Sequence, residues 1–506
     1  MGVSSCEQRD ESIAMNAAPW LKHLQLECLL LSRERPFWLV LLGLTLLCGA
    51  AVWDGIDQAQ RQHQIALDLF SHQRTRVETD AIKARALDQG QQTLNPYFDP
   101  RLAGAYGTRY LAAPALLPQH IATVLEQGQR NVLSDYYQLQ LDQRERYTSA
   151  HELVNPHRQL IGPIDLTFIT LYLLPLAMIG LSYHIRTDDH AHGRLGLIAT
   201  THPYGIARVV RLRLLLRLAP PVVLVLASGI VACRLSPADY PADRGTTALA
   251  WAALLSVYSS VWALLITAMV RRSNQPAACF RALLASWLII QIGLPAAVHV
   301  YSQRTALLPD RATSIRIMRD LNDRLHPHSH TAPPQDTQAK SDQVKTQTKQ
   351  PSASPWTAAR QYYRQRLSEQ TQLDQWTWPL EQAFLRQQTS QARLIDQWAF
   401  VSPALMFQSQ LQRLAGHDLG RHQRFFLRVE HWHDILRAYF RQRMAAESAS
   451  QPSLDSYLAN TRYPPFVSQT DPTPWFNRRD LCYWVFWLLS AIGAWIYGGR
   501  GRHSVL

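Results

Sequence analysis

The residues best suited to chemistry or binding lie in a polar segment, residues 185–217, between two apolar stretches. The candidate contact residues, two acids, a glycine, a leucine and a proline, are Asp188, Asp189, Gly193, Leu195 and Pro203. A short acidic turn, a small amphipathic piece and a proline stop together suit a docking knob for a cytosolic partner. A plain loop whose arginines only set the orientation in a membrane explains the same residues equally well.

Familiar catalytic and nucleotide-binding motifs are absent from the sequence. There is no G-x-x-x-x-G-K-[ST] phosphate loop and no Gly-Lys pair, so the chain does not bind ATP by that route. The H-E-x-x-H, C-x-x-C and G-x-S-x-G patterns are missing as well. We therefore predict no catalytic residue and no enzyme activity for this chain.

Histidine is the commonest metal ligand, so the histidine-rich places were considered as metal sites. Three histidines stand at alternate positions, at His326, His328 and His330. They open a stretch, residues 326–355, that is almost free of large apolar residues and is predicted to be disordered, so a solvated tract is preferred. His431 and His433 straddle Trp432 and would face different sides of a helix. No metal site is predicted.

Polar residues inside apolar stretches are costly in a membrane and are examined first for function. Gln291 and Pro295 lie inside one such stretch, where a polar spot and a kink suit a gated path, although both residue types are common in membrane helices. Asp165 stands at the end of another stretch, where a helix-capping role is favoured. The near absence of acids at mid-membrane argues against an ion-coupled carrier.

Six apolar segments approach the ~20 residues that a helix needs to cross a bilayer. They are residues 36–53, 163–183, 218–233, 247–270, 282–301 and 481–497. The third is short, and we expect Arg211, Arg213 and Arg217 to snorkel at its inner end. The predicted fold is an all-α polytopic membrane protein with six transmembrane helices and two large, mainly helical extracytoplasmic insertions.

Arginines in the short loops predict the orientation, because basic residues favour the cytoplasmic side. Segment 184–217 carries six arginines, whereas loop 235–246 has one arginine and two acids. Both termini are therefore expected in the cytoplasm. The predicted parts are a cytoplasmic N-terminus (1–35), helix 1 (36–53), a first outer domain (54–162), helix 2 (163–183), a coupling loop (184–217), helices 3–5 (218–301), a second outer domain (302–480), helix 6 (481–497) and a tail (498–506).

Residues 17–35 predict an amphipathic helix on the inner membrane surface. Its leucines would contact lipid, while Glu27, Arg33 and Arg35 stay in water. The polar residues 54–85 have apolar positions at helical spacing and are expected to prolong the first span outward. In the second outer domain, Pro379 and Pro403 are expected to end or start helices.

Composition limits the choice of partners. The chain has 506 residues and a formal net charge of +13, but its 51 basic residues include only 5 lysines and are spread along the chain. Without a run of interleaved arginines and aromatics, no nucleic-acid partner is predicted. None of the six cysteines lies in residues 54–162 or 303–478, so the outer domains must fold without internal disulfides.

At several places the sequence resembles ABC type-2 transporter permeases. Residues 183–217 resemble their cytosolic loop, and Glu27 with Arg33–Trp38 resembles the lead into their first span. Three further stretches resemble the branch with two large extracytoplasmic domains, the second a domain of unknown function: Asn155–Pro175, Ser402–Phe425 (through Ser402-Pro403-Ala404-Leu405 and Arg421-His422-Gln423-Arg424-Phe425) and Pro464-Pro465-Phe466.

The resemblance implies a permease subunit of an exporter in the bacterial inner membrane. It would work as a homodimer, or as a heterodimer with a second permease, on a separate ABC ATPase that binds ATP and Mg²⁺, and a periplasmic partner could dock outside. Family loops usually carry two glutamates directly before the glycine, whereas here Ala191 and His192 precede Gly193, and His202 replaces a frequent glutamine. The alternative is a non-transporting receptor or assembly platform.

Overall fold

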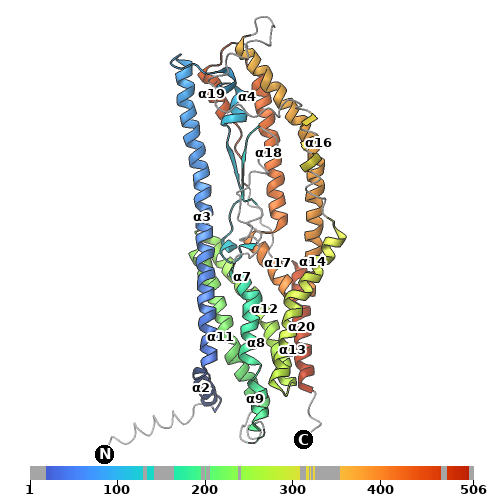
Figure 1. Cartoon of the computed structure of the whole chain (residues 1–506). Coiled ribbons are helices and arrows are strands. Elements are labelled where there is room, and N and C mark those ends of the chain that lie inside the picture. Colours follow the sequence, from blue (N-terminus) through green and yellow to red (C-terminus); the bar gives the residue numbers. More distant parts are fainter. Residues whose placement is uncertain are drawn as a thin grey trace, which may run out of the picture.

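The chain folds mainly into helices, and in this computed structural model they form a long molecule (Figure 1). The apolar helices gather at one end of it. The structure describes residues 19–128, 134–141, 164–194, 196, 200, 205–237, 241–307, 315–317, 319–320, 323–324, 354–448, 450–468 and 476–500. The histidine tract at 326–330 and the predicted disordered stretch as far as residue 353 lie outside them, whereas Ser354 and Pro355 are described and begin a helix.

Helix α3 (Arg35–Asp88) is one continuous helix of 54 residues that runs along the whole molecule. At 1.5 Å per residue it is about 80 Å long, far more than a bilayer core requires. Its first turn contains Pro36, which is tolerated there because the first N–H groups of a helix have no helical partner. The prediction that residues 54–85 prolong the first span is confirmed.

Five helices among the described residues are long and apolar enough to cross a membrane, judged by length and composition. They span Arg35–Asp88, Leu166–His190, Arg208–Leu235, Arg244–Arg272 and Pro276–Thr305. The predicted sixth span corresponds to helix α20 (Arg478–Arg500), which packs along α12 but is not among the five. The chain is thus a mainly helical protein with several helices suited to a membrane.

Within the bundle, two of the apolar helices contain π-turns. The elements are α7 (Leu166–Phe168), η5 (Ile169–Leu173), α8 (Leu174–Ser182), α9 (Ile185–Ala191), α11 (Gly205–Leu235), α12 (Pro241–Arg272), α13 (Pro276–Leu288), η6 (Ile289–Gly293) and α14 (Leu294–Thr305). A short helix, α2 (Pro19–Ser32), precedes α3 at the same end of the bundle as α9 (Figure 1).

The polar end is an arm built from two parts of the chain. The first part contributes η1 (Pro96–Phe98), α4 (Ala103–Ala105), η2 (Tyr106–Tyr110), β1 (Ala113–Leu116), η3 (Ile121–Val124) and β2 (Tyr136–Leu139). Strands β1 and β2 pair antiparallel, with Ala113 opposite Leu139. This small sheet departs from the all-α prediction, because four-residue strands have too few positions to show a clear alternation.

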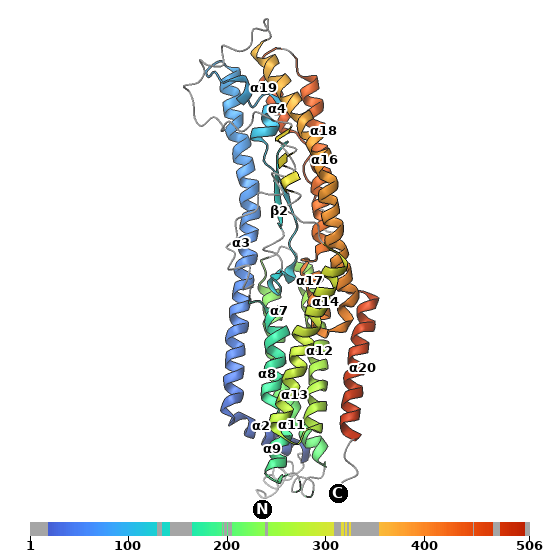
Figure 2. The same ribbon diagram turned by 45° about the vertical axis from the view of Figure 1, so that its right-hand side comes forward.

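The second part contributes α16 (Pro355–Trp398), η8 (Ala399–Val401), α17 (Pro403–Ala415), α18 (Leu419–Ala446) and α19 (Leu454–Thr461). Figure 2 shows α16 and α18 side by side, and they pack together. The expectation that Pro379 ends a helix is wrong: α16 continues through it, since packing against α18 and α14 outweighs the lost hydrogen bond. Pro403 does start α17, as predicted.

Two hydrophobic cores follow this division. One lies in the arm, around residues such as Tyr106, Phe425 and Phe440. The other lies in the bundle, and it also includes η3 and most apolar residues of α17. Helix α17 therefore belongs to the outer segment in sequence but to the bundle in packing. We call residues 399–417 the foot of the arm.

Candidate coupling site

Arg213 connects three helices at the α9 end of the bundle. From α11, its Nε donates to Glu27 Oε1 of α2 at 2.8 Å, and its Nη1 donates to Asp189 Oδ2 of α9 at 2.5 Å. Both carboxylates are almost fully buried, with side-chain exposures of 6% and 9%. Two buried acids sharing one guanidinium hold α2 and α9 against the same turn of α11, because a carboxylate without its partner there would be costly.

A second ion pair supports the same attachment. Arg217, one turn further along α11, donates to Glu34, which stands between α2 and α3. Trp38 Nε1 donates to the Ser32 carbonyl at 2.9 Å, which fixes the turn from α2 into α3. Arg213 and Arg217, predicted to snorkel at the inner end of a span, both pair with acids far away in sequence. Glu27 is buried rather than wet, whereas Arg33 and Arg35 are exposed as predicted.

The described candidate docking residues differ in burial: Asp189 is buried, Asp188 is half-buried and Gly193 is exposed. Asp189 faces inward to Arg213, while Asp188 is half-buried one position earlier on α9. Gly193 has a φ of +68°, and its N–H donates to the His190 carbonyl at 3.1 Å, so it ends α9 in the left-handed conformation that favours glycine. Leu195 and Pro203 lie outside the described residues.

Gln291 takes part in a buried polar contact between the two π-turns. Its Nε2 donates to the Leu171 carbonyl of η5 at 2.5 Å and to the Tyr258 hydroxyl of α12, and that hydroxyl donates to the same carbonyl at 3.1 Å. The Leu171 carbonyl needs such partners, since Pro175 has no N–H to offer four residues later. π-turns are frequent at functional positions, and the pathway role of Gln291 stays a prediction.

Pro295 creates a docking point for the foot. In η6 the Leu294 N–H donates to the Ile289 carbonyl, and Pro295 has no N–H, so the Ile290 carbonyl requires a partner from elsewhere. Ser402, at the start of α17, supplies it through a hydroxyl hydrogen bond of 2.8 Å. Pro295, which belongs to the predicted pathway, thus also marks where the arm contacts the bundle.

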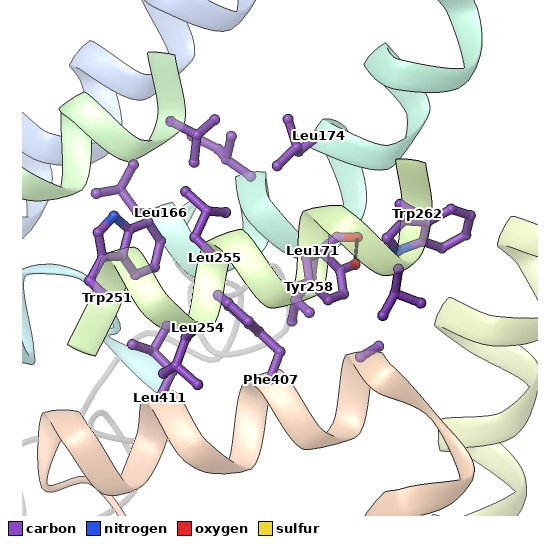
Figure 3. Packing of buried hydrophobic residues seen from close by; sticks show 14 of the residues in the cluster. Leu166, Leu171, Leu174, Trp251, Leu254, Leu255, Tyr258, Trp262, Phe407 and Leu411 are labelled. Carbon is purple, nitrogen blue, oxygen red and sulfur yellow. Dashed lines mark hydrogen bonds between the residues drawn. The ribbon is translucent and has the colours of Figure 1, made fainter. Parts of the chain in front are cut away.

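Phe407 places the foot deep among the apolar helices (Figure 3). Its ring lies 5.0 Å from that of Tyr258 and 6.0 Å from that of Trp251, measured between centroids, and all three residues are fully buried. Leu411, one turn further along α17, points at the same helix beside Leu254. The foot therefore contacts the helix turn that also carries the polar contact with Gln291.

Helix α20 also holds the foot. Trp487 Nε1 donates to the Phe400 carbonyl at 2.7 Å, and Trp484 Nε1 donates to Gln410 Oε1 at 2.9 Å. Arg413 pairs with Asp480 at 3.0 Å. These three contacts join the end of the arm to α20, which in turn lies along α12.

Two buried acidic residues, Glu126 and Asp165, lie where the foot meets the segment after η3 and the start of α7. Glu126, after η3, accepts from His417 Nδ1 at 2.9 Å, and both side chains are buried. Asp165 caps α7 by accepting from the Phe168 N–H at 2.8 Å, as predicted, and it also accepts from the Gln127 N–H at 3.0 Å. The junction is therefore polar on this side and apolar around Phe407.

No group of three or more potential metal ligands comes together in the part of the chain that the structure describes. His433 is buried and its Nε2 lies 3.0 Å from the Gln140 carbonyl oxygen, while His431 is exposed on α18. The two histidines thus face different sides of the helix, as their spacing predicts.

These features define a mainly helical protein with several helices suited to a membrane and an arm that packs onto them through the foot. Comparison with protein families matches residues 333–456 to a domain of unknown function, DUF3526. Within the described residues, the match covers α16, the foot, α18 and the start of α19. No curated protein and no solved structure matches the chain.

Proposed function

We propose that the chain is the transmembrane permease subunit of an ATP-binding-cassette exporter in the bacterial inner membrane. In this proposal α20 is the sixth span, both termini are cytoplasmic, and the arm stands in the periplasm. A separate ATPase subunit binds ATP and Mg²⁺ and contacts α9. The permease pairs with a second copy or with a sister permease, and the transported substrate passes between the two.

The observation that carries the proposal is the double contact of Arg213. A short helix at the end of a bundle transmits force only if it is fastened to the helices that must move. Helix α9 meets this condition, because Asp189 ties it to α11 and, through the same guanidinium, to α2. The exposed residues of α9 and the following turn, among them His190 and His192, are then left for an external partner.

The foot offers a route for the movement to travel further. Helix α12 packs against α11 on one side and contacts Phe407 of the foot on the other. A displacement of α11 relative to α12 would therefore move the arm through the contact with Phe407. The continuous helix α3 would transmit the same displacement to the far end of the arm. In this account the ATPase acts on the spans and on the periplasmic arm together.

Coexpression with a phosphate-loop ATPase encoded by a neighbouring gene tests the proposal. Tagged permease is expected to copurify with the ATPase. Asp188→Lys, which reverses a charge on α9 without removing an Arg213 partner, is expected to reduce the recovered ATPase at least tenfold. Asp68→Lys makes the same change on an exposed position of α3 in the arm and should leave recovery unchanged. Normal recovery with Asp188→Lys and with an added residue after Gly193 would refute the proposed contact.

The second candidate function is a receptor or assembly platform whose arm binds a periplasmic partner without transport. It is favoured by the arm itself, which has its own hydrophobic core and contains the matched domain of unknown function. Coexpression separates the two: a platform would fold and hold its periplasmic partner with no ATPase bound, whereas a permease would stimulate ATP hydrolysis in vesicles.

A further inference from the structure

Arg109 stands in η2, a π-turn of the arm, and two neighbouring side chains hold its guanidinium group in place. The guanidinium carbon lies over the Phe98 ring, 4.4 Å from the ring centroid, and Nε donates to the Tyr363 hydroxyl at 3.4 Å. That hydroxyl in turn donates to the Tyr97 carbonyl of η1. Arg109 is nevertheless exposed. The arginine is therefore oriented before any ligand binds, at a position that a ligand can reach.

Close packing sets the positions of the two groups that hold Arg109. Tyr363 of α16 is 3% exposed, and a Cβ added to Gly104 of α4 would lie 2.3 Å from the Tyr363 Cβ. Helix α4 can therefore approach Tyr363 this closely only because position 104 is glycine. The Tyr110 hydroxyl donates to the Phe98 carbonyl at 2.5 Å, which holds η1 beside η2.

The two terminal nitrogens of Arg109 are free to bind a ligand. Within the part of the chain that the structure describes, no carboxylate lies within ion-pair distance of this side chain, and its only hydrogen bond is the one from Nε. A guanidinium group is planar, and its outward N–H groups match the two oxygens of a carboxylate or of a phosphate. The site therefore suits an anion that offers two oxygens side by side.

Exposed aromatic and apolar side chains lie next to this cation. Phe98 and Tyr362 are 40% and 42% exposed, and Leu94, which precedes η1, is 42% exposed. Tyr362 belongs to the same surface because its ring meets that of Tyr97 edge to face, at 5.4 Å between centroids and 78° between planes. With this packing, and with a guanidinium group over Phe98, the rings do not form the flat platform on which a sugar or a base stacks. They suit apolar side chains instead.

The site lies far from the headgroups of the membrane. Helix α3 continues for about 50 Å between residue 53, the expected end of the first span, and its last residue, Asp88. Helix α4 lies at the end of the molecule opposite α2 (Figure 1). Residues 303–478 contain 22 basic and 15 acidic side chains, and residues 54–162 contain 11 and 12. The outer segments are therefore net positive, which attracts acidic proteins from solution.

We propose that Arg109 binds a carboxylate side chain of a partner protein, and that an apolar residue beside this acid packs on Phe98 and Tyr362. The carboxylate accepts hydrogen bonds from the terminal nitrogens of Arg109, which are fixed by the ring below them. The apolar contact adds affinity that a free anion lacks.

The site requires that the arm is surrounded by water and does not depend on the proposed exporter function. Binding of the acidic partner and recovery of the ATPase can therefore succeed or fail separately. A permease and an assembly platform could both use this surface, because it lies at the opposite end of the molecule from α9 (Figure 1).

Fluorescence anisotropy with the purified full chain in a non-ionic detergent tests the site. Three labelled hexapeptides are titrated: one in which phenylalanine and leucine alternate with glutamate and aspartate, one with the two acids replaced by glutamine and asparagine, and one with the two apolar residues replaced by alanine. The first peptide is expected to bind at least tenfold more tightly than the amide peptide, since a charged hydrogen-bonded pair is lost. The alanine peptide should bind about fivefold more weakly than the first.

Variants of the chain locate the binding. Arg109→Gln is expected to weaken the Kd of the first peptide at least tenfold. Arg109→Lys keeps the charge but cannot donate two parallel hydrogen bonds, so it should also weaken binding severalfold. An unchanged Tm of both variants would show that they fold as the unchanged chain does.

Arg462→Gln is the matched control, because Arg462 is exposed at the end of α19, which packs against α3 rather than α16. Its affinity for the first peptide should equal that of the unchanged chain. No binding of the first peptide up to about 1 mM, equal binding of the amide peptide, or equal weakening by Arg109→Gln and Arg462→Gln would each overturn the site. Displacement of the peptide by an equal concentration of acetate would also overturn it, because a carboxylate alone would then suffice.

Discussion

The foot and the α9 attachment fasten parts to the two ends of one bundle, but by different means. The foot is buried: Phe407 lies between aromatic rings of α12, and hydrogen bonds from Ser402 and Trp487 close around it. Helix α9 has seven residues and is tied to α2 and α11 by ion pairs centred on Arg213.

This difference suggests different tasks. An apolar junction has no alternative partner in water, so the arm and the bundle are expected to move as one body. The buried carboxylate of Asp189 has a second cation, the exposed Arg194, at 3.7 Å in addition to Arg213, so it keeps a partner when α9 shifts. The α9 end is therefore the adjustable attachment, as expected for a part that responds to an external subunit.

The largest effect is expected from Phe407→Ala in the foot. Removing a fully buried aromatic side chain costs about 3–5 kcal/mol, because the neighbouring rings cannot fill the cavity. Thermal unfolding of the purified chain should show a lower Tm and earlier proteolysis between arm and bundle. Leu427→Ala, on a position of α18 that is 51% exposed, is the control and should change stability by less than about 0.5 kcal/mol. Equal Tm values for the two variants would show that the foot is not a structural junction.

Arg213→Gln should loosen α9 and leave the foot intact. The change removes charged hydrogen bonds to Glu27 and Asp189, worth about 1.5–3 kcal/mol together with the cost of unpaired acids. Hydrogen exchange should accelerate in α9 and in α2, while α17 keeps its protection. Arg33→Gln, nearby and exposed, should change neither. Faster exchange in α17 would contradict the separation of the two attachments.

A double-mutant cycle on Gln291 and Tyr258 examines how the spans meet the foot. Gln291→Leu alone or Tyr258→Phe alone should lower the free energy of unfolding by about 1–2 kcal/mol. In each single variant the remaining side chain still donates to the buried Leu171 carbonyl. The double change should cost more than the sum of the two, since that carbonyl then has no donor from either side chain. Strict additivity in the measured unfolding free energies would mean that the two side chains act independently.

The smallest effect is expected from salt. Raising ionic strength from 0.05 to 1 M shortens the screening length to about 3 Å and should weaken the α9 attachment by less than about 1 kcal/mol, because its acids are partly shielded from water. Hydrogen exchange in α9 should rise modestly, while exchange in α17 should fall or stay the same. A larger salt effect on α17 would reverse the comparison.

The sequence predicted the features that depend on local pattern. The apolar segments lie in helices, α3 extends beyond the first span, and Asp165 caps its helix. Pro379 shows the limit of such rules, since tertiary packing of α16 overrides a helix breaker. The strands β1 and β2 are too short for their alternation to be visible.

The contacts that make the two attachments could not be predicted, because they join residues far apart in sequence. Glu27 and Arg213 are 186 positions apart, and Ser402 reaches a carbonyl 112 positions earlier. A pattern of arginines in a helix shows that charge is present but not which acid it meets. Pro403 predicted a helix boundary at the start of α17, yet the packing of α17 inside the bundle rather than in the arm follows only from the three-dimensional arrangement.

Site-specific crosslinking tests the central claim most directly. A photoreactive residue in place of His190, exposed on α9, is compared with one in place of Glu78, exposed on the outer half of α3, in the chain coexpressed with the neighbouring phosphate-loop ATPase. The account predicts an ATPase adduct from position 190 and none from position 78. An assembled complex that gives no adduct from position 190, or equal adducts from both, would contradict the proposal that α9 couples the ATPase to the spans.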